Sequence, residues 1–221
     1  MKVAVLFFAL SLTITAQIFK VEKVNGEVLV LKGTSENYSP VKAGDELSAK
    51  DMIITGEKAA VHLRKGTEKF ILKNNSALNL NSIKKLSINE LLLALAMEEI
   101  KAVPKKSNSE MKNTAVYGSS RNNSSLKNIS PSGLGLKKLN GAKQLAESGF
   151  IESAILSARE IFRRHPETRK AVTERLYFAR LFESLNLTDE AYNEYSAIYD
   201  LNLNPDEKRF VSAKLETLIS K

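Results

Sequence analysis

The chain of 221 residues contains no cysteine and no tryptophan, and only two histidines. Without cysteine there is no disulfide, no thiolate metal site and no cysteine nucleophile. The sequence also lacks the spaced motifs of phosphate-binding loops, serine hydrolases and zinc hydrolases. We therefore expect a protein that is not an enzyme and that has no catalytic residue, no cofactor and no metal.

Long apolar runs are also scarce, and the longest lies at the start of the chain. Lys2 precedes a mostly apolar stretch at residues 3–14, and the small residue Ala16 follows it. This layout predicts a secretory signal peptide over residues 1–16, with a buried N-terminal helix or strand as the alternative. Its cleavage would leave no stable membrane span and a secreted, periplasmic or cell-envelope protein.

Charge of one sign is concentrated in one part of the chain, whose net charge is +8. Residues 101–138 carry eight basic side chains and one acidic one, whereas the flanking parts are nearly neutral. Residues 101–133 are rich in Ser and Asn and poor in large apolar residues, which predicts a flexible basic linker. We expect no nucleic-acid binding. The linker charge indicates weak contact with glycan or anionic lipid, or simply a solubilising role.

Residues 17–82 alternate short runs of strand-forming residues with turns. Asn25-Gly26 predicts a hairpin between strands at 18–24 and 27–31. Residues 28–31 are all apolar, so we expect the second strand to be covered on both faces. At least five such strands predict a small all-β sandwich or roll.

Five fragments follow one another in this stretch: Gly26-x-Val28-x-Val30, Gly44-Asp45-x-Leu47, Asp51-x-Ile53-x-Thr55-Gly56, Val61-x-Leu63 and Leu78-x-Leu80. In this order they resemble the FecR-type domain, an extracytoplasmic β module of bacterial envelope proteins. The resemblance implies a location in the bacterial envelope. It also implies an alternative function, that of a membrane-anchored regulatory component that retains its N-terminal segment.

Asp45, Glu46 and Asp51 form an acidic cluster near turns, for which a calcium site is one interpretation. Calcium requires six to eight oxygen ligands, and the pattern does not supply them, so we expect these carboxylates to cap turns. His62 falls on the polar side of its strand and is expected to be exposed rather than to act as a ligand or base.

A short apolar helix is expected within residues 83–100. Ser87 and Glu90 have the spacing of a capping box, and an apolar run follows at residues 91–97. The run is too short to span a bilayer, so we expect a helix that is buried on most sides. The β module, the helical domain and another chain are all candidate partners, with packing inside the chain as the default.

From residue 134 to 221 the apolar residues follow helical periodicity, in up to five helices with short connections that predict helical hairpins. Thr188 is the expected N-cap of the fourth. Two hairpins share a pattern of small, bulky and breaking residues: Ala142, Gly149, Ala154 and Pro166, then Ala179, Phe182, Ala191 and Tyr195. The pattern resembles tetratricopeptide repeats, with a plain helix bundle as the alternative.

The sequence thus predicts a multidomain chain, β then α, with an apolar helix and a linker between the two parts. In tetratricopeptide arrays the first helix of each pair lines a concave face that binds protein partners. The resemblance therefore implies a partner site at Lys143, Arg180, Glu147 and Ser184, with solvated surface charges as the alternative. We expect a non-enzymatic binding or scaffold protein.

Overall fold

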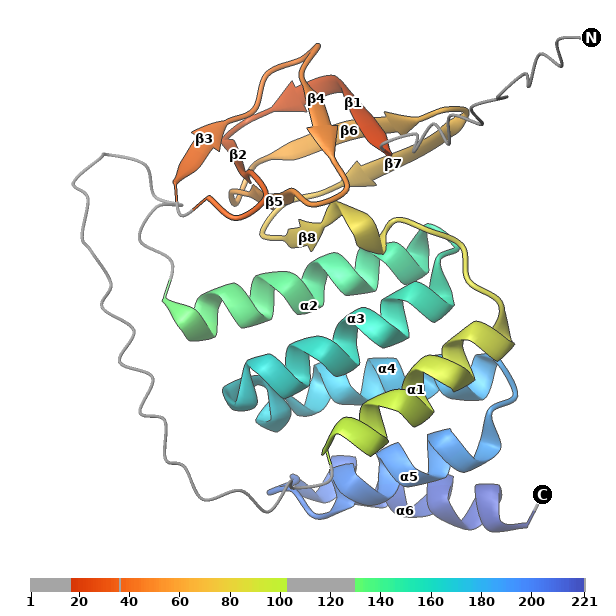
Figure 1. Cartoon of the computed structure of the whole chain (residues 1–221). Coiled ribbons are helices and arrows are strands. Elements are labelled where there is room, and N and C mark those ends of the chain that lie inside the picture. The colour runs from red at the N-terminus through yellow and green to blue at the C-terminus, as the bar shows by residue number, and fades with distance from the viewer. Residues whose placement is uncertain (1–16, 36, 103–129, 221) are drawn as a thin grey trace, which may run out of the picture.

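The computed structural model describes residues 17–35, 37–102 and 130–220. The expected signal peptide and residues 103–129 of the expected linker lie outside the described residues. In the described part, strands come first and helices follow, which confirms the expected β-then-α order (Figure 1). None of the helices in that part is long and apolar enough to cross a membrane.

Eight strands form two antiparallel four-stranded sheets, so of the two expected architectures, a sandwich or a roll, the chain has the sandwich. The sheets have the strand orders β4-β1-β6-β7 and β3-β2-β5-β8. The strand bounds are β1 (Ile18–Asn25), β2 (Val28–Leu31), β3 (Tyr38–Pro40), β4 (Glu46–Ser48), β5 (Met52–Thr55), β6 (Ala60–Lys65), β7 (Glu68–Leu72) and β8 (Ala77–Asn79).

The hairpin expected at Asn25-Gly26 is wrong. β1 pairs with β4 and β6, whereas β2 pairs with β3 and β5, so the two strands belong to different sheets. Gly26 has a φ of +69°, and a Cβ atom there would lie 2.5 Å from the carbonyl oxygen of Lys58. The dipeptide therefore does make a tight turn, which only glycine tolerates, but the turn carries the chain from one sheet to the other.

Helices and the connections between them make up the rest of the described chain. Their bounds are η1 (Leu80–Ser82), α1 (Ile88–Ala102), α2 (Pro131–Glu147), α3 (Ile151–Arg164), η2 (Pro166–Lys170), α4 (Val172–Ser184), α5 (Thr188–Tyr199) and α6 (Pro205–Ile219). The expected capping box is confirmed, because Ser87 Oγ accepts from the Glu90 amide at 3.2 Å and Glu90 accepts from the Ser87 amide at 2.8 Å. The expected cap at Thr188 is wrong: Leu187 holds the N-cap position and makes no side-chain cap.

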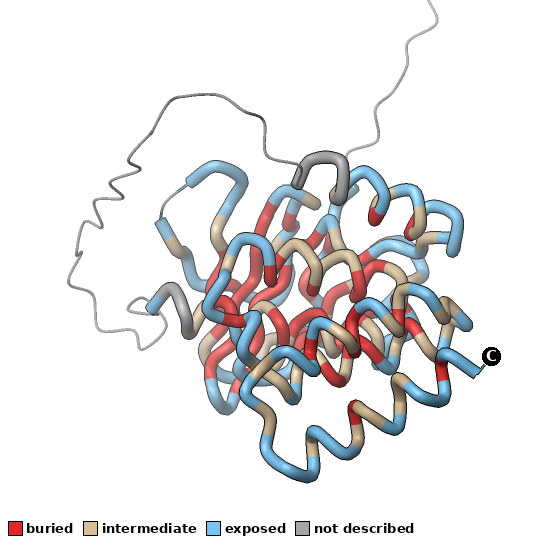
Figure 2. The backbone as a smooth tube through the Cα atoms, turned by 90° about the horizontal axis from the view of Figure 1, so that it is seen from below, coloured by how far each residue is buried: buried red, intermediate tan, exposed pale blue. Residues whose placement is uncertain are grey.

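The helices after α1 stack as antiparallel pairs. α2 packs along α3, α4 along α5, and α6 along α5 at the C-terminal end (Figure 1). The small residues Ala142, Ala154, Ala179 and Ala191 are fully buried, so neighbouring helices approach closely there. Buried positions run through the middle of the sandwich and of the helices, and exposed positions lie at the periphery (Figure 2).

The sandwich and the helices share one apolar core. β8 lies on α2, and a single cluster of buried side chains extends from Phe19 in the sandwich to Leu139 and Phe178 in the helices. Phe70 of β7 meets Phe150 edge to face, with the ring centroids 6.2 Å apart. The two parts predicted as separate modules therefore pack directly against each other.

Both faces of β2 are buried, as expected. Val28 and Val30 lie in the sandwich interior, while Leu29 belongs to a second apolar cluster with Ile54. Leu134 of α2 packs against that second cluster. The outer cover of this sheet is therefore a helix from the C-terminal half of the chain.

Two features hold β8 against α2. A Cβ atom on Gly141 would lie 2.2 Å from the carbonyl oxygen of Ala77, so the backbones touch at this point. One turn later, the buried Gln144 accepts from the Lys73 amide at 2.7 Å and donates to Ser76 Oγ at 2.7 Å. The Asn140 amide adds donors to the carbonyls of Asn74 and Asn75. The contact therefore combines a close backbone approach with hydrogen bonds from side-chain amides of α2.

α1 packs against α3, so its partner lies within the same chain. Leu91 and Leu95 are buried in the core of the helices. Leu93 is 64% exposed and Met97 is 49% exposed. The expectation of a helix buried on most sides is therefore wrong, because only one face of α1 is covered and the opposite face carries apolar side chains into solvent.

Candidate functional site

Lys143 and Arg180, two of the four expected partner-binding residues, lie on α2 and α4, the first helices of the two pairs. The Lys143 ammonium lies 5.3 Å from the centroid of the Tyr177 ring on α4. The Arg180 guanidinium lies 4.9 Å from the centroid of the Phe210 ring on α6. We call these four side chains the cation–aromatic row, because Lys143 of α2 lies over a ring of α4 and Arg180 of α4 lies over a ring of α6.

The Glu183 carboxylate on α4 links the cation–aromatic row to α5 and α6. Glu183 accepts from the Tyr195 hydroxyl at 2.5 Å and pairs with Lys214 at 2.7 Å. Burial and the hydrogen bond to Glu183 raise the pKa of Tyr195 far above its usual range. The hydroxyl therefore stays a donor, and α4, α5 and α6 are fixed relative to one another beneath the exposed Arg180.

The other two expected partner-binding residues make contacts elsewhere. Glu147 lies 3.8 Å from Lys73 of the sandwich, and both side chains are largely exposed. The Ser184 hydroxyl donates to the carbonyl of Leu181 at 2.7 Å. Glu147 is thus directed towards the sandwich and Ser184 towards its own helix.

Asp45 and Asp51, two of the three residues of the acidic cluster, cap turns of the sandwich. Asp51 accepts from the amides of Gly33 at 3.0 Å and Ser48 at 2.8 Å, and Asp45 accepts from the Lys42 amide at 2.8 Å. Among the described residues there is no group of His, Cys, Asp and Glu side chains arranged to hold a metal ion. Carboxylates bound to backbone amides in this way need no cation to satisfy them.

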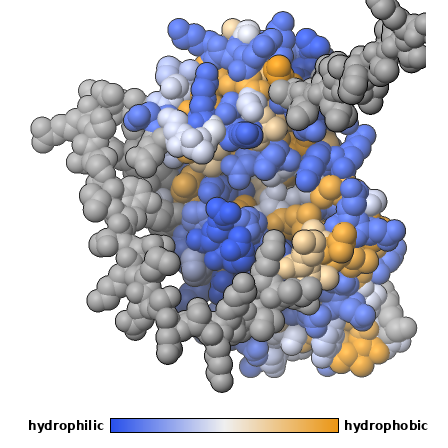
Figure 3. Space-filling model, viewed as in Figure 1, coloured by the Kyte–Doolittle hydropathy of each residue, from blue (hydrophilic) through white to orange (hydrophobic). Residues whose placement is uncertain are grey.

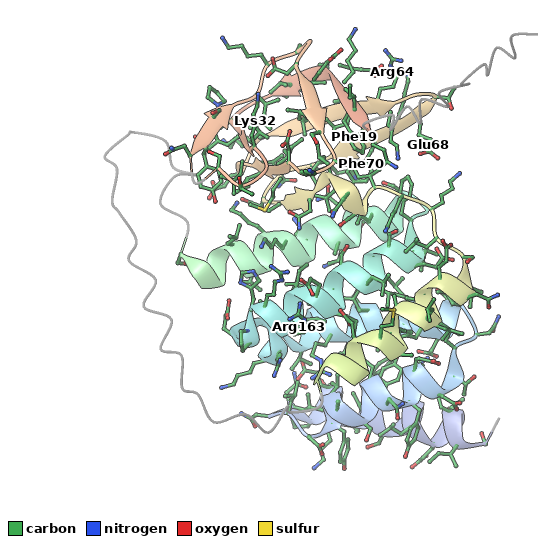
Figure 4. The ribbon with its side chains drawn as sticks, viewed as in Figure 1. Phe19, Lys32, Arg64, Glu68, Phe70 and Arg163 are labelled. Atoms are coloured by element: carbon green, nitrogen blue, oxygen red, sulfur yellow. The ribbon has the colours of Figure 1, made fainter. Side chains whose placement is uncertain are left out.

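A cleft of about 370 Å³ lies where β8 and η1 face α2 and α3. Figure 3 shows a strongly hydrophilic patch over the C-terminal half of α3, where Figure 4 labels Arg163, beside an apolar patch over α1. The charged side chains that line the cleft are Lys84, Lys138, Glu160 and Arg164, with His165 beside them. Three cations therefore face one carboxylate.

The Glu160 carboxylate already pairs with arginines of its own helix. Glu160 accepts from both Arg163 and Arg164. Lys138, in contrast, has its ammonium 3.2 Å from Nε2 of His165. Glu167 lies 3.4 Å from the other ring nitrogen, Nδ1. This carboxylate favours a proton on Nδ1, so that Nε2 accepts from Lys138.

The two half-buried groups at this end of the cleft, Lys138 and His165, both lie in surroundings that disfavour their charged forms. Burial lowers the pKa of His165, and the nearby Lys138 lowers it further. Burial also lowers the pKa of Lys138, with Arg164 adding to the effect and Glu160 opposing it. The site therefore holds more positive charge than its own carboxylates neutralise.

Sequence reasoning did not identify this pair. In the sequence, His165 marks only the end of a helix before Pro166, and Lys138 lies 27 positions earlier, on a different helix. Antiparallel packing of α2 on α3 brings the start of one helix to the end of the other. The only available signal was that both residues occupy matching ends of an expected hairpin.

Comparison of the chain with protein-family models, with curated proteins and with solved structures finds no match.

Proposed function

We propose that this protein is a non-enzymatic scaffold of the bacterial envelope that binds a protein partner through the exposed face of α2, α4 and α6. The observation that supports the proposal most strongly is the cation–aromatic row. Lys143 and Arg180 are held on rings of neighbouring helices, so their charges are positioned before a partner arrives. Such preorganisation reduces the entropy lost on binding.

The partner chemistry that suits this row is an acidic segment or a C-terminal carboxylate. Fixed cations on neighbouring helices can bind successive carboxylates of an extended peptide. The resemblance of the helices to tetratricopeptide repeats supports the same face. The signal-peptide pattern at residues 1–16 and the FecR-type fragments support the envelope location.

The test uses residues 17–221 as bait to capture partner proteins from a bacterial envelope fraction. Lys143→Met with Arg180→Met removes both charges but keeps an apolar stem on each ring, so we expect capture to fall about tenfold with little change in melting temperature. Lys20→Met with Lys69→Met, at exposed positions of the sandwich, is the matched control. Equal capture by all three proteins would contradict the proposal.

The second candidate is a membrane-anchored regulatory component of FecR type, supported by the same fragments of the sandwich. The two candidates differ in the fate of the N-terminal segment. N-terminal sequencing of the mature protein distinguishes them: a start near Gln17 or Ile18 supports export, and retention of Met1 supports the anchor.

A further inference from the structure

The cleft between the sandwich and α3 has two chemically different ends. At one end lie Lys138, Arg164 and His165. At the other, Ser153 Oγ donates to the carbonyl of Lys84 at 2.6 Å, and Leu86 and Leu156 are half-buried. The lining positions on α3 run from residue 153 to residue 164, which corresponds to roughly 16 Å of helix.

The polar end has donors that the chain itself does not use fully. The Lys138 ammonium has three hydrogens, and its hydrogen bond in the described part of the chain is to the neutral His165 ring. Ser157, half-buried in the same wall, makes no side-chain hydrogen bond within the described residues. A group with several acceptor oxygens and negative charge is the complement of these donors.

We propose that this cleft binds a small amphiphilic carboxylate, with its carboxylate beside Lys138 and Arg164 and its apolar body against Leu156 and Leu86. The carboxylate would neutralise charge that Glu160 leaves uncompensated. The site lies between β8 and α3 and is separate from the cation–aromatic row, so the two proposals fail or succeed independently.

Hexanoate is a suitable probe, and the two histidines of the chain provide the readout. We expect hexanoate to shift the imidazole NMR signals of His165 saturably and to raise the pKa of His165, because a nearby anion favours the charged ring. His62, on β6 of the sandwich, serves as the internal control and should not respond. Glu167, Lys138 and Arg164, the other charged groups that act on His165, are unchanged in this comparison.

Two matched compounds separate the contributions of charge and apolar surface. Hexanamide keeps the apolar body without the charge, and acetate keeps the charge without most of the body. We expect each to bind at least about tenfold more weakly than hexanoate. Binding of hexanamide or acetate as tight as that of hexanoate would overturn the proposal, as would equal shifts at His62 and His165.

Lys138→Met should weaken hexanoate binding about tenfold or more, whereas Lys20→Met, at an exposed position of β1, should leave it unchanged. If Lys138→Met does not fold, Arg164→Gln removes the second cation at an exposed position and should weaken binding in the same way. Unchanged affinity in a folded variant of either residue would overturn the assignment.

Discussion

The helix stack is covered on two sides, by β8 and by α1, and the two contacts are built differently. Against β8, the backbone of α2 touches a strand at Gly141, and the Gln144 amide both accepts and donates a hydrogen bond. Against α1, the covering side chains are the leucines Leu91 and Leu95. The first contact depends on exact placement, and the second on the apolar area that is removed from water.

This difference has consequences for how each contact tolerates change. A backbone contact cannot accommodate an added methyl group, and a buried amide cannot lose its partners cheaply. An apolar contact loses energy in proportion to the surface removed, and it accepts other apolar residues of similar size. The same reasoning predicts a small effect of substitutions at Leu93, which is exposed on the outer face of α1.

The largest expected effect is at α1. Leu95→Asp should lower the free energy of unfolding by about 4 kcal/mol, because it removes a buried leucine and places an unpaired carboxylate in the core. Leu93→Asp, on the exposed face of the same helix, is the matched control and should change it by less than about 0.5 kcal/mol. Chemical denaturation measures both, and similar losses in the two variants would show that α1 is placed wrongly.

The next effect tests the backbone contact with β8. Alanine normally stabilises a helix interior by about 1 kcal/mol relative to glycine. Gly141→Ala should instead destabilise the protein by about 2 kcal/mol, since its methyl group would meet the Ala77 carbonyl.

Gly135→Ala is the comparison, because its nearest neighbours are side-chain atoms of Thr168 and His165. In the same denaturation experiment, Gly135→Ala should lower the free energy of unfolding by less than Gly141→Ala does. A stabilising Gly141→Ala would refute the close approach of β8 to α2.

A smaller loss is expected at the buried amide. Gln144→Ala leaves the Lys73 amide without its partner and removes one of the two side-chain donors to Ser76 Oγ, which costs about 1–2 kcal/mol. Gln144→Glu keeps the acceptor for the Lys73 amide but places a carboxylate beside Ser76, and it should be intermediate at neutral pH. Thermal melting of the wild type and the two variants gives their order of stability. A melting temperature of Gln144→Ala equal to that of the wild type would contradict the polar contact.

The smallest effect is a pH dependence from His165. Because burial and Lys138 lower its pKa in the folded state, the unfolded chain binds the proton first as pH falls below about 6.5. Stability should therefore decrease from that pH downward and level off below the folded-state pKa. His165→Gln should remove this part of the pH dependence, and identical stability-versus-pH curves for wild type and variant would refute it.

Local patterns in the sequence were sufficient to predict most elements. The capping box at Ser87 and Glu90, the five helices after residue 130 and the two-sided burial of β2 all follow from spacing over a few residues. The hairpin at Asn25-Gly26 failed because a turn signal specifies backbone conformation and not which strands pair. The burial of α1 was overestimated because an apolar run in the sequence does not show how many faces of the helix other elements will cover.

The sequence by itself determined the order of the elements, their approximate bounds and the turns that separate them, because these depend on residues close together in the chain. Only the tertiary structure decided that β8 lies on α2, that Lys143 stacks on Tyr177, and that Lys138 meets His165. Each of these contacts joins residues from different elements. They form through packing, because the two residues of each contact come together only when whole helices and sheets pack against one another.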